Sequence, residues 1–337
     1  MGILISREID TLLEETSRSF FLTLKVLPKK IRGQIGMLYL LARLADTIAD
    51  SSDGDTNKLL QSIEGYNAFA QGNSSTPPDL AELSKIQNDI SEANLLNNVA
   101  EVVSCLGQFS ISDQARIRTC LDIIVGGQTL DLSRFGFAEQ NTITSLDTDD
   151  ELDDYTYRVA GSVGEFWTHL TLDHLVSVNP EEEKMLFEYG VRFGKALQLI
   201  NILRDIPEDL ILGRCYIPEP KLAEIGLSSK DLLDSDNMES FRPLFDSYID
   251  KAADHLNAAV DYIGMLPHRQ YRLRIACMLP VLIGQRTLIL LRQGNVLNSE
   301  GRIKVLRPEI KQMRNKTLFA IFSRRRSRNL LNKNRNI

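Results

Sequence analysis

The sequence has few of the residues that build covalent or metal-held scaffolds. Its four cysteines, Cys105, Cys120, Cys215 and Cys277, show no CxxC spacing, and its four histidines form no pair with the spacing of zinc ligands. These absences argue against a disulfide framework and against a zinc site. Cysteine use of this kind is typical of the reducing cytoplasm, which is the compartment we expect.

Signals for entering or crossing a membrane are also missing. The N-terminus, "MGILISREIDTLLEE", turns acidic too early for a signal peptide. The longest apolar run, around "CMLPVLIG", is far shorter than the ~18 to 20 residues that span a bilayer. We therefore expect a chain without a membrane span, and contact with the inner face of the membrane stays open.

An excess of positive charge is absent as well. The 337 residues carry 39 Lys and Arg against 45 Asp and Glu, for a net charge of -6. Proteins that bind nucleic acid generally present an overall basic surface to the phosphates. The composition is otherwise that of an ordinary globular protein, so we expect a small-molecule partner and no nucleic acid.

No stretch shows the period-two alternation of a strand. Apolar residues instead recur every three or four positions, and the few Pro and Gly residues fall mainly between these stretches. The pattern predicts an all-α protein of roughly a dozen helices. The clearest helical stretches are 8–24, 31–51, 95–109, 113–134, 181–206, 247–264 and 271–293.

The domain organisation follows from the short loops. Neither 50–58 nor 71–82, the two most loop-like segments, is long enough for a domain linker. We predict one domain over 1–300 and a C-terminal extension over 301–337, and we expect a monomer. Residues 309–337 hold nine Lys or Arg against one Glu, which is typical of a solvated end or of a tail that docks on an anionic membrane.

Two acids lie one turn apart in the apolar stretch "LARLADTIAD". Positions i and i+4 lie on one face of a helix, so Asp46 and Asp50 project together. Paired carboxylates suit Mg²⁺, a hard cation that is commonly held by protein acids together with substrate phosphates. One such pair alone is more often a solvated helix face.

The same spacing recurs in "QLINILRDIPED". Asp205 and Asp209 follow an apolar helix, with Gln198 and Asn201 on neighbouring turns. Acids one turn apart repel each other, so two such pairs indicate cations that neutralise them, and two facing pairs would hold two or three Mg²⁺ ions around a diphosphate. Pro207 lies inside the second pair and is expected to kink the helix there.

A third acid-rich run, 146–155, is interpreted as structural. Its acids lie just before a predicted helix, where they complement the positive end of the helix dipole.

Arginines near the acid pairs would supply the charge that a diphosphate needs. Arg18 lies in "TSRSFFLTL", Arg43 lies three residues before Asp46, and Arg214 follows the second pair. The guanidinium fork matches phosphate oxygens at two points. Each arginine taken alone is more often a surface ion-pair partner.

Six segments in this order resemble the squalene and phytoene synthase family. They are "SRSFFLTLKVLP", "YLLARLADTIAD", "GGQTLDLSRF", "YTYRVAGSVGEFW", "LQLINILRDIPEDL" and "GRCYIP", spread over residues 16–220. "RLRIACMLPVLIGQRTL" and "IKVLRPEIK" resemble the C-terminal part of the family. The resemblance implies the class I terpenoid synthase fold, a single-domain helical bundle around a central cavity, and head-to-head joining of two isoprenoid diphosphates.

The resemblance also implies roles for individual residues. The four acids of the two pairs, with Asn201, would bind Mg²⁺. Tyr155 would move a proton in the cyclopropane-forming step, and Arg214 would hold the departing diphosphate. The diphosphate oxygens and the mouth of the site would be lined by Ser17, Arg18, Ser19, Phe20, Arg43, Gln198 and Asn201.

An allylic cation needs a dry apolar cavity, because water would convert it to an alcohol. Phe20, Phe21, Phe166, Trp167 and Leu199 are candidates to line such a cavity, although side chains at these spacings are more often plain core.

Within the family, "GEFW" after the "VAG" motif is most similar to bacterial squalene synthases. The expected substrate is then farnesyl diphosphate, and NADPH would reduce presqualene diphosphate to squalene, although the sequence has no GxGxxG dinucleotide motif.

Several alternatives stay open. Phytoene, dehydrosqualene and presqualene diphosphate synthases of the same family perform no reduction. A terpene cyclase or chain-elongating prenyltransferase would favour a DDxxD motif, which the sequence lacks. A non-catalytic isoprenoid-binding protein with this fold is the most distant alternative.

Overall fold

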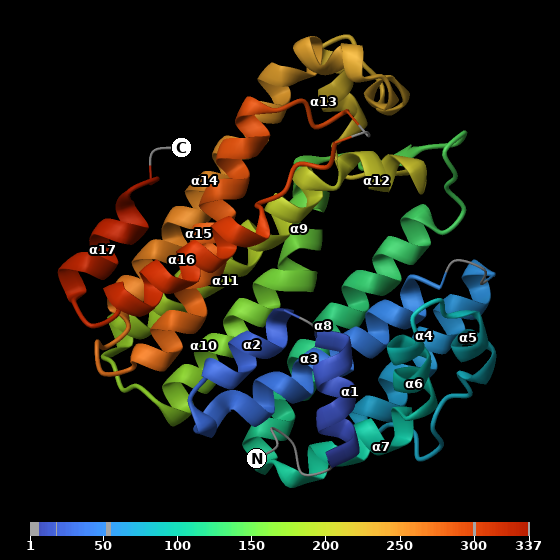
Figure 1. Ribbon diagram of the computed structural model, residues 1–337. Helices are drawn as coiled ribbons and strands as arrows, with labels where there is room; N and C mark the ends of the chain where they lie inside the picture. Colours follow the sequence, from blue (N-terminus) through green and yellow to red (C-terminus); the bar gives the residue numbers. More distant parts are fainter. Residues whose placement is uncertain (1–6, 18, 52–54, 299–300, 336–337) are drawn as a thin grey trace. The chain divides into compact units, whose positions relative to one another are not determined.

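The computed structural model describes residues 7–17, 19–51, 55–298 and 301–335, and it is helical almost throughout (Figure 1). The predicted all-α fold is confirmed. Two short strands, β1 (Thr144–Ser145) and β2 (Arg214–Cys215), pair in parallel and form the one sheet found in these residues.

The chain divides into two compact units. Unit 1 comprises residues 1–136 and 169–175, and unit 2 comprises 137–168 and 176–337. Residues 301–335 therefore belong to unit 2. The boundary between the two units does not coincide with residue 300, where the sequence suggested a domain boundary.

Unit 1 contains the helices from the N-terminus to α8. The long pair α3 and α8 packs side by side, with α4 against α8. The helix predicted over 8–24 is two helices, α1 and α2. The elements are α1 (Arg7–Ser17), α2 (Ser19–Val26), α3 (Lys29–Ala49), α4 (Thr56–Gln71), α5 (Ala81–Ile86), α6 (Ile90–Asn97), α7 (Val99–Ser104), a 3₁₀ turn (Cys105–Gln108) and α8 (Ile111–Phe135).

Unit 2 is built on the packing of α11 against α14 and of α14 against α15. Helix α10 begins in unit 2 and its last turns belong to unit 1. The remaining elements are α9 (Asp149–Thr156), a π-helical turn (Tyr157–Gly161), α10 (Ser162–His174), α11 (Pro180–Arg204), α12 (Ile206–Ile211), α13 (Glu219–Glu224), two 3₁₀ turns (Ser229–Leu233 and Ser235–Asn237), α14 (Met238–Met265), α15 (Tyr271–Gln293), α16 (Arg307–Ala320) and α17 (Arg324–Asn332).

Glycines let α11 lie very close to the "VAGSVG" segment. A Cβ atom added at Gly164 would lie 1.9 Å from the carbonyl oxygen of Gly190, and one at Gly194 would lie 2.0 Å from that of Ala160. Any larger residue at these positions would force the backbones apart. This part of the family-like motif therefore fixes the position of α11, which carries Gln198 and Asn201.

Helix α15 is a candidate membrane span that the sequence analysis did not identify. By length and composition alone it could span a bilayer, since it has 23 residues and a mean hydropathy of 1.5 over its most apolar window. It escaped notice in the sequence because Arg274 and Arg286 interrupt its apolar runs. About 61% of that window is buried inside the protein, as in the core helix of a folded domain, so this feature is weak evidence for a span.

Candidate active site

The first acid pair lies at the end of α3, in unit 1. Asp46 is half-buried in the last turn of the helix, and Asp50 is exposed and caps it. The backbone N–H of Asp50 donates to the carbonyl oxygen of Asp46 at 2.8 Å, so the two acids remain one turn apart. The predicted placement on one helix face is confirmed, and α3 ends at the second acid.

The environment of Asp46 disfavours its negative charge. Burial and the neighbouring charge of Asp50 raise the pKa of Asp46 to about 7, against the lowering effects of Arg43 and Gln128. Gln128, from α8, donates its amide N–H to Asp46 Oδ1 at 2.5 Å. The pKa of an ordinary aspartate is near 4. A cation bound here would therefore stabilise the charged form of Asp46, which its surroundings disfavour.

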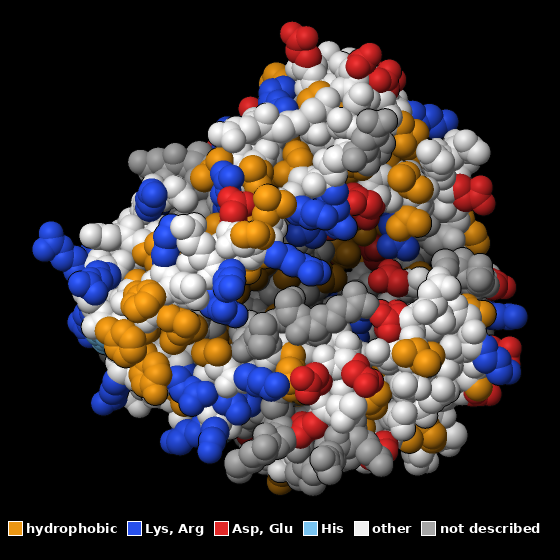
Figure 2. Space-filling view, in the orientation of Figure 1, with side chains coloured by type: hydrophobic (Ala, Val, Ile, Leu, Met, Phe, Trp, Pro, Cys, Tyr) orange, Lys and Arg blue, Asp and Glu red, His pale blue; other side chains and the backbone are white. Residues whose placement is uncertain are grey.

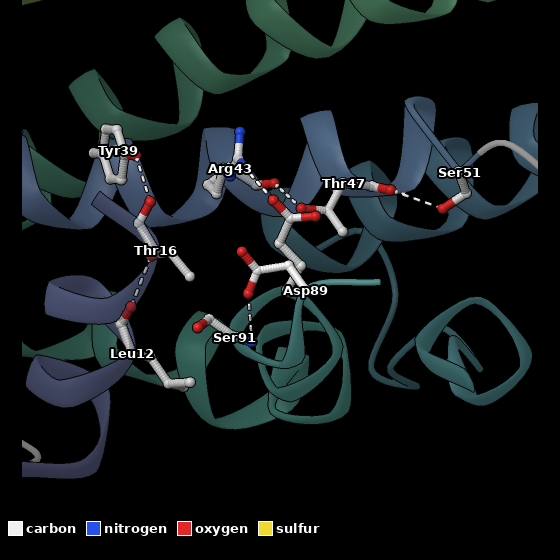
Figure 3. A network of polar contacts seen from close by, with 9 residues as sticks. Leu12, Thr16, Tyr39, Arg43, Thr47, Ser51, Asp89 and Ser91 are labelled. Atoms are coloured by element: carbon white, nitrogen blue, oxygen red, sulfur yellow. Dashed lines mark hydrogen bonds and ion pairs between the residues drawn. The ribbon is translucent and has the colours of Figure 1, made fainter. Parts of the chain in front are cut away.

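Arg43 is paired with a residue that the sequence did not suggest. Its guanidinium forms an ion pair with Glu92 of α6, and although burial opposes the charge, Glu92 makes the net pKa of Arg43 higher than usual. Figure 3 shows Arg43 on α3 facing the start of α6, where Asp89 accepts from the Ser91 N–H, and Thr47 donates to the Arg43 carbonyl oxygen at 2.8 Å. In this state Arg43 ties α3 to α6, and its contact with a diphosphate stays a prediction.

The N-terminal "SRSF" segment is described only in part. Ser17 is buried, and its hydroxyl donates to the carbonyl oxygen of Leu13, which makes it a helix-end contact of α1. Arg18 lies outside the described residues, as do the side chains of Ser19 and Phe20. Their predicted contacts with diphosphate oxygens therefore stay predictions.

The second acid pair lies in unit 2, where one helix ends and the next begins. Helix α11 ends at Arg204, and α12 starts at Ile206 with Pro207 in its first turn. The predicted kink at Pro207 is thus a complete break between two helices. The N–H of Asp209 still donates to the carbonyl oxygen of Asp205 at 2.9 Å, so the one-turn spacing survives the break.

Two arginines hold Asp205. The Arg204 guanidinium donates to both carboxylate oxygens, at 2.7 and 2.6 Å, and Arg302 donates to Asp205 Oδ1. Burial would raise the pKa of Asp205, but these two arginines lower it below its ordinary value. Arg302 also contacts Glu208 at 3.1 Å, so it crosses from the segment before α16 to the start of α12.

Two polar residues of α11 stand on the turns before this pair. Asn201 is half-buried, and its carbonyl oxygen accepts from the N–H of Asp205 at 2.9 Å. Gln198 is half-buried one turn earlier. Both lie close to Asp205 along the helix, as the sequence predicts.

Tyr155 lies against a second tyrosine in unit 2. Its ring is buried in α9 and stacks on the ring of Tyr216 with 5.0 Å between centroids, and the Tyr216 hydroxyl donates to the Tyr155 hydroxyl at 3.4 Å. Tyr216 follows β2, which contains the half-buried Arg214. The β1–β2 pairing thus places the "GRCYIP" segment next to the "YTYRVAG" segment.

The candidate cavity residues are mainly core. Phe21, Phe166 and Leu199 are buried, whereas Trp167 is half-buried. Each contributes to the interior of its own unit. Their role in binding a prenyl chain stays a prediction.

The acids of the 146–155 run have structural partners. Asp149 accepts from the hydroxyl of Tyr248 at 2.7 Å, and Asp153 accepts from Lys195 at 2.6 Å. Asp149, Asp150 and Glu151 form the first turn of α9 instead of preceding it, so they do complement the helix dipole. This supports the structural interpretation of the run.

Four side chains that contact the candidate site residues were missed from the sequence: Gln128 at Asp46, Glu92 at Arg43, Arg302 at Asp205 and Tyr216 at Tyr155. Gln128 lies in the quoted "GGQTLDLSRF" segment and Tyr216 in "GRCYIP", so the motifs contained a signal for both. Glu92 and Arg302 come from segments without a motif. Among the described residues, no group of three or more His, Cys, Asp or Glu is placed to hold a metal ion.

Comparison with known proteins identifies the family. A family profile described as squalene/phytoene synthase matches residues 13–309. A bifunctional lycopene cyclase/phytoene synthase of Gibberella fujikuroi is 26% identical over 307 residues, which are 90% of this chain. The chain spans about half of that relative, since the match covers 50% of its length.

A shorter relative and a solved structure agree with this match. The 4,4'-diapophytoene synthase of Staphylococcus haemolyticus is 26% identical over 259 residues, which cover 73% of this chain and 76% of that protein. The solved complex of TcSQS with the ligand E5700 has a TM-score of 0.75 at 18% identity, covering 97% of this chain and 96% of that one. The fold is that of the class I terpenoid synthases, and the chain belongs to the squalene/phytoene synthase family.

Proposed function

We propose that this protein joins two farnesyl diphosphates head to head in a Mg²⁺-dependent reaction, and that NADPH then reduces the presqualene diphosphate formed to squalene. Members of the family are prenyltransferase-type enzymes, which supports the first step. The observation that carries the proposal is Asp46: a partly buried carboxylate beside a second acid, in surroundings that call for a cation.

The residues of both acid pairs suit magnesium. Each pair supplies carboxylate oxygens, the donors that Mg²⁺ prefers. A pair gives only two acidic ligands, and Mg²⁺ usually completes its coordination with water and substrate phosphate. When bound, the ions would stabilise the negative charge that develops on the leaving diphosphate.

Side chains of this chain would orient the acids and move a proton. Gln128 orients Asp46 through its hydrogen bond, and Arg204 orients Asp205 in the same way. Tyr155, buried against Tyr216, would move a proton to an acceptor such as the released diphosphate.

A second candidate is a synthase that stops before reduction. The two relatives described above make phytoene or 4,4'-diapophytoene by their names, which favours a product of that kind. The substrate would then be the C20 geranylgeranyl diphosphate. Alternatively, the C15 farnesyl diphosphate would be converted without the transfer of a hydride from NADPH.

One assay separates the candidates. Purified protein is incubated with Mg²⁺ and either farnesyl or geranylgeranyl diphosphate, with and without NADPH, and the hydrocarbon is identified by mass spectrometry. Squalene that appears only with NADPH is the expected result. Phytoene from the C20 substrate, or dehydrosqualene from the C15 substrate, would replace the squalene proposal by the second candidate, and no Mg²⁺-dependent product would favour a non-catalytic isoprenoid-binding protein.

A further inference from the structure

The basic C-terminal extension is a folded part of unit 2. Helices α16 and α17 pack on α15, and α17 also packs on α14 (Figure 1). The buried Gln285 amide donates to the carbonyl oxygen of Leu331 at 2.8 Å, and Arg335 forms an ion pair with Asp261 at 2.6 Å. These contacts fix the two helices on unit 2, while most of their side chains stay exposed to solvent.

Large apolar side chains point outward where α16 meets α17. Leu318, Phe319 and Phe322 are 44%, 75% and 81% exposed, and the three fall within five residues. Single exposed apolar residues are common, but a cluster of aromatic rings held in water by folded helices indicates a surface that contacts something.

Positive charge surrounds these rings. Figure 2 shows hydrophobic side chains gathered next to Lys and Arg on the face formed by α16 and α17. No Asp or Glu occurs in residues 310–337. We define the basic–aromatic patch as Leu318, Phe319 and Phe322 together with the exposed cations Arg314, Lys316, Arg324, Arg325, Arg326 and Arg328.

We propose that the basic–aromatic patch docks this protein on an anionic lipid bilayer. Aromatic and aliphatic side chains flanked by Lys and Arg are the composition of surfaces that lie in the interface of a membrane. The cations would be attracted by anionic headgroups, and the rings would enter the headgroup boundary. Charge complementarity favours a lipid surface, because residues 310–337 offer exposed cations and no Asp or Glu that would repel anionic headgroups.

Vesicle sedimentation tests this proposal with the full-length protein. Binding is measured to phosphatidylcholine vesicles with and without phosphatidylglycerol, at low and at high salt. Each cation near an anionic surface contributes about fivefold to binding, so replacing Arg324, Arg325 and Arg326 by Gln should weaken binding about a hundredfold. Replacing Phe319 and Phe322 by Ser should weaken it about tenfold or more.

Matched controls separate the patch from charge and hydrophobicity in general. Changing Lys29, Lys30 and Lys184 to Gln removes the same charge from other exposed positions, and changing Ile111 and Phe137, which are 87% and 74% exposed, to Ser removes comparable apolar surface. Both controls should bind like the original protein. Circular dichroism and thermal melting verify that every variant is folded.

Three outcomes would overturn the proposal. They are no binding to anionic vesicles at low salt, equal losses in the patch variants and the controls, and binding that is the same on neutral vesicles and insensitive to salt. If sedimentation velocity instead shows a dimer that only the patch variants lose, the patch is an interface between two copies of this chain, and the lipid proposal is wrong.

Discussion

The first and second acid pairs have the same spacing and opposite electrostatic surroundings. Burial and Asp50 raise the pKa of Asp46 to about 7, whereas Arg204 and Arg302 lower that of Asp205. In the first pair the helix continues to the second acid, whereas in the second pair the break between α11 and α12 lies at the first acid, Asp205. A shared sequence spacing therefore does not fix the charge state of the carboxylates, which depends on side chains from other segments.

The largest expected effect comes from removing the acid whose charge is disfavoured. Asp46→Asn should lower turnover by about a hundredfold to a thousandfold, because a carboxylate ligand of the charge-stabilising cation is lost. The helical circular dichroism signal should stay intact. Asp122→Asn, at an exposed position of α8 in the same unit, is the control and should retain full turnover. Equal losses in both variants would show that Asp46 has no special role.

A smaller loss is expected at the tyrosine pair of unit 2. Tyr155→Phe removes the hydroxyl that would move a proton, and general acid–base groups contribute about a hundredfold or more. Tyr216→Phe keeps the ring stacking and removes only a 3.4 Å hydrogen bond, so its turnover should fall by less than about tenfold. Product formation measured for both variants tests this order, and a larger effect at Tyr216 would reverse the assignment.

These predictions rest on features that the sequence reveals to different degrees. The all-α fold, the one-turn spacing of both acid pairs and the interruption at Pro207 follow from residues close together in the chain. Gln128 and Arg302 could not be assigned in this way, because they reach Asp46 and Asp205 across 82 and 97 residues. Long-range partners depend on how helices pack, and a periodicity in one sequence does not specify that.

A third partly shielded acid, Asp113 of α8, differs from both pairs because its role is structural. Asp113 accepts hydrogen bonds from Gln34 at 3.0 Å and from His174 at 2.8 Å. Burial would raise the pKa of Asp113, but these hydrogen bonds lower it below its ordinary value. Its contribution to stability is therefore present above pH 4, the unfolded value, and is lost as the pH falls through the lower folded value.

Asp113→Asn should lower the free energy of unfolding by about 1 to 3 kcal/mol at pH 7, and by less near pH 3. Urea unfolding at the two pH values measures this difference. A loss that is the same at both values would mean that the charge of Asp113 has no part in stability.

The smallest effect is expected at the arginine that bridges to the second pair. Arg302 is 47% exposed, so solvent weakens its ion pair with Asp205. Arg302 occupies a carboxylate that Mg²⁺ would bind. Arg302→Gln should therefore increase the affinity for Mg²⁺ by about two- to fivefold, as measured by calorimetry. Arg307→Gln, at another exposed arginine, should leave the affinity unchanged. A decrease in affinity for Arg302→Gln would mean that this arginine supports the metal site.

The release of diphosphate from farnesyl diphosphate decides whether the two acid pairs take part in a Mg²⁺-dependent reaction. The release is followed while Mg²⁺ is titrated into the original protein and into Asp46→Asn and Asp205→Asn. We predict a release that depends on Mg²⁺ and that is lost in both variants. A release that needs no Mg²⁺, or that both variants retain in full, would contradict the assignment of the two acid pairs to the chemistry of this protein.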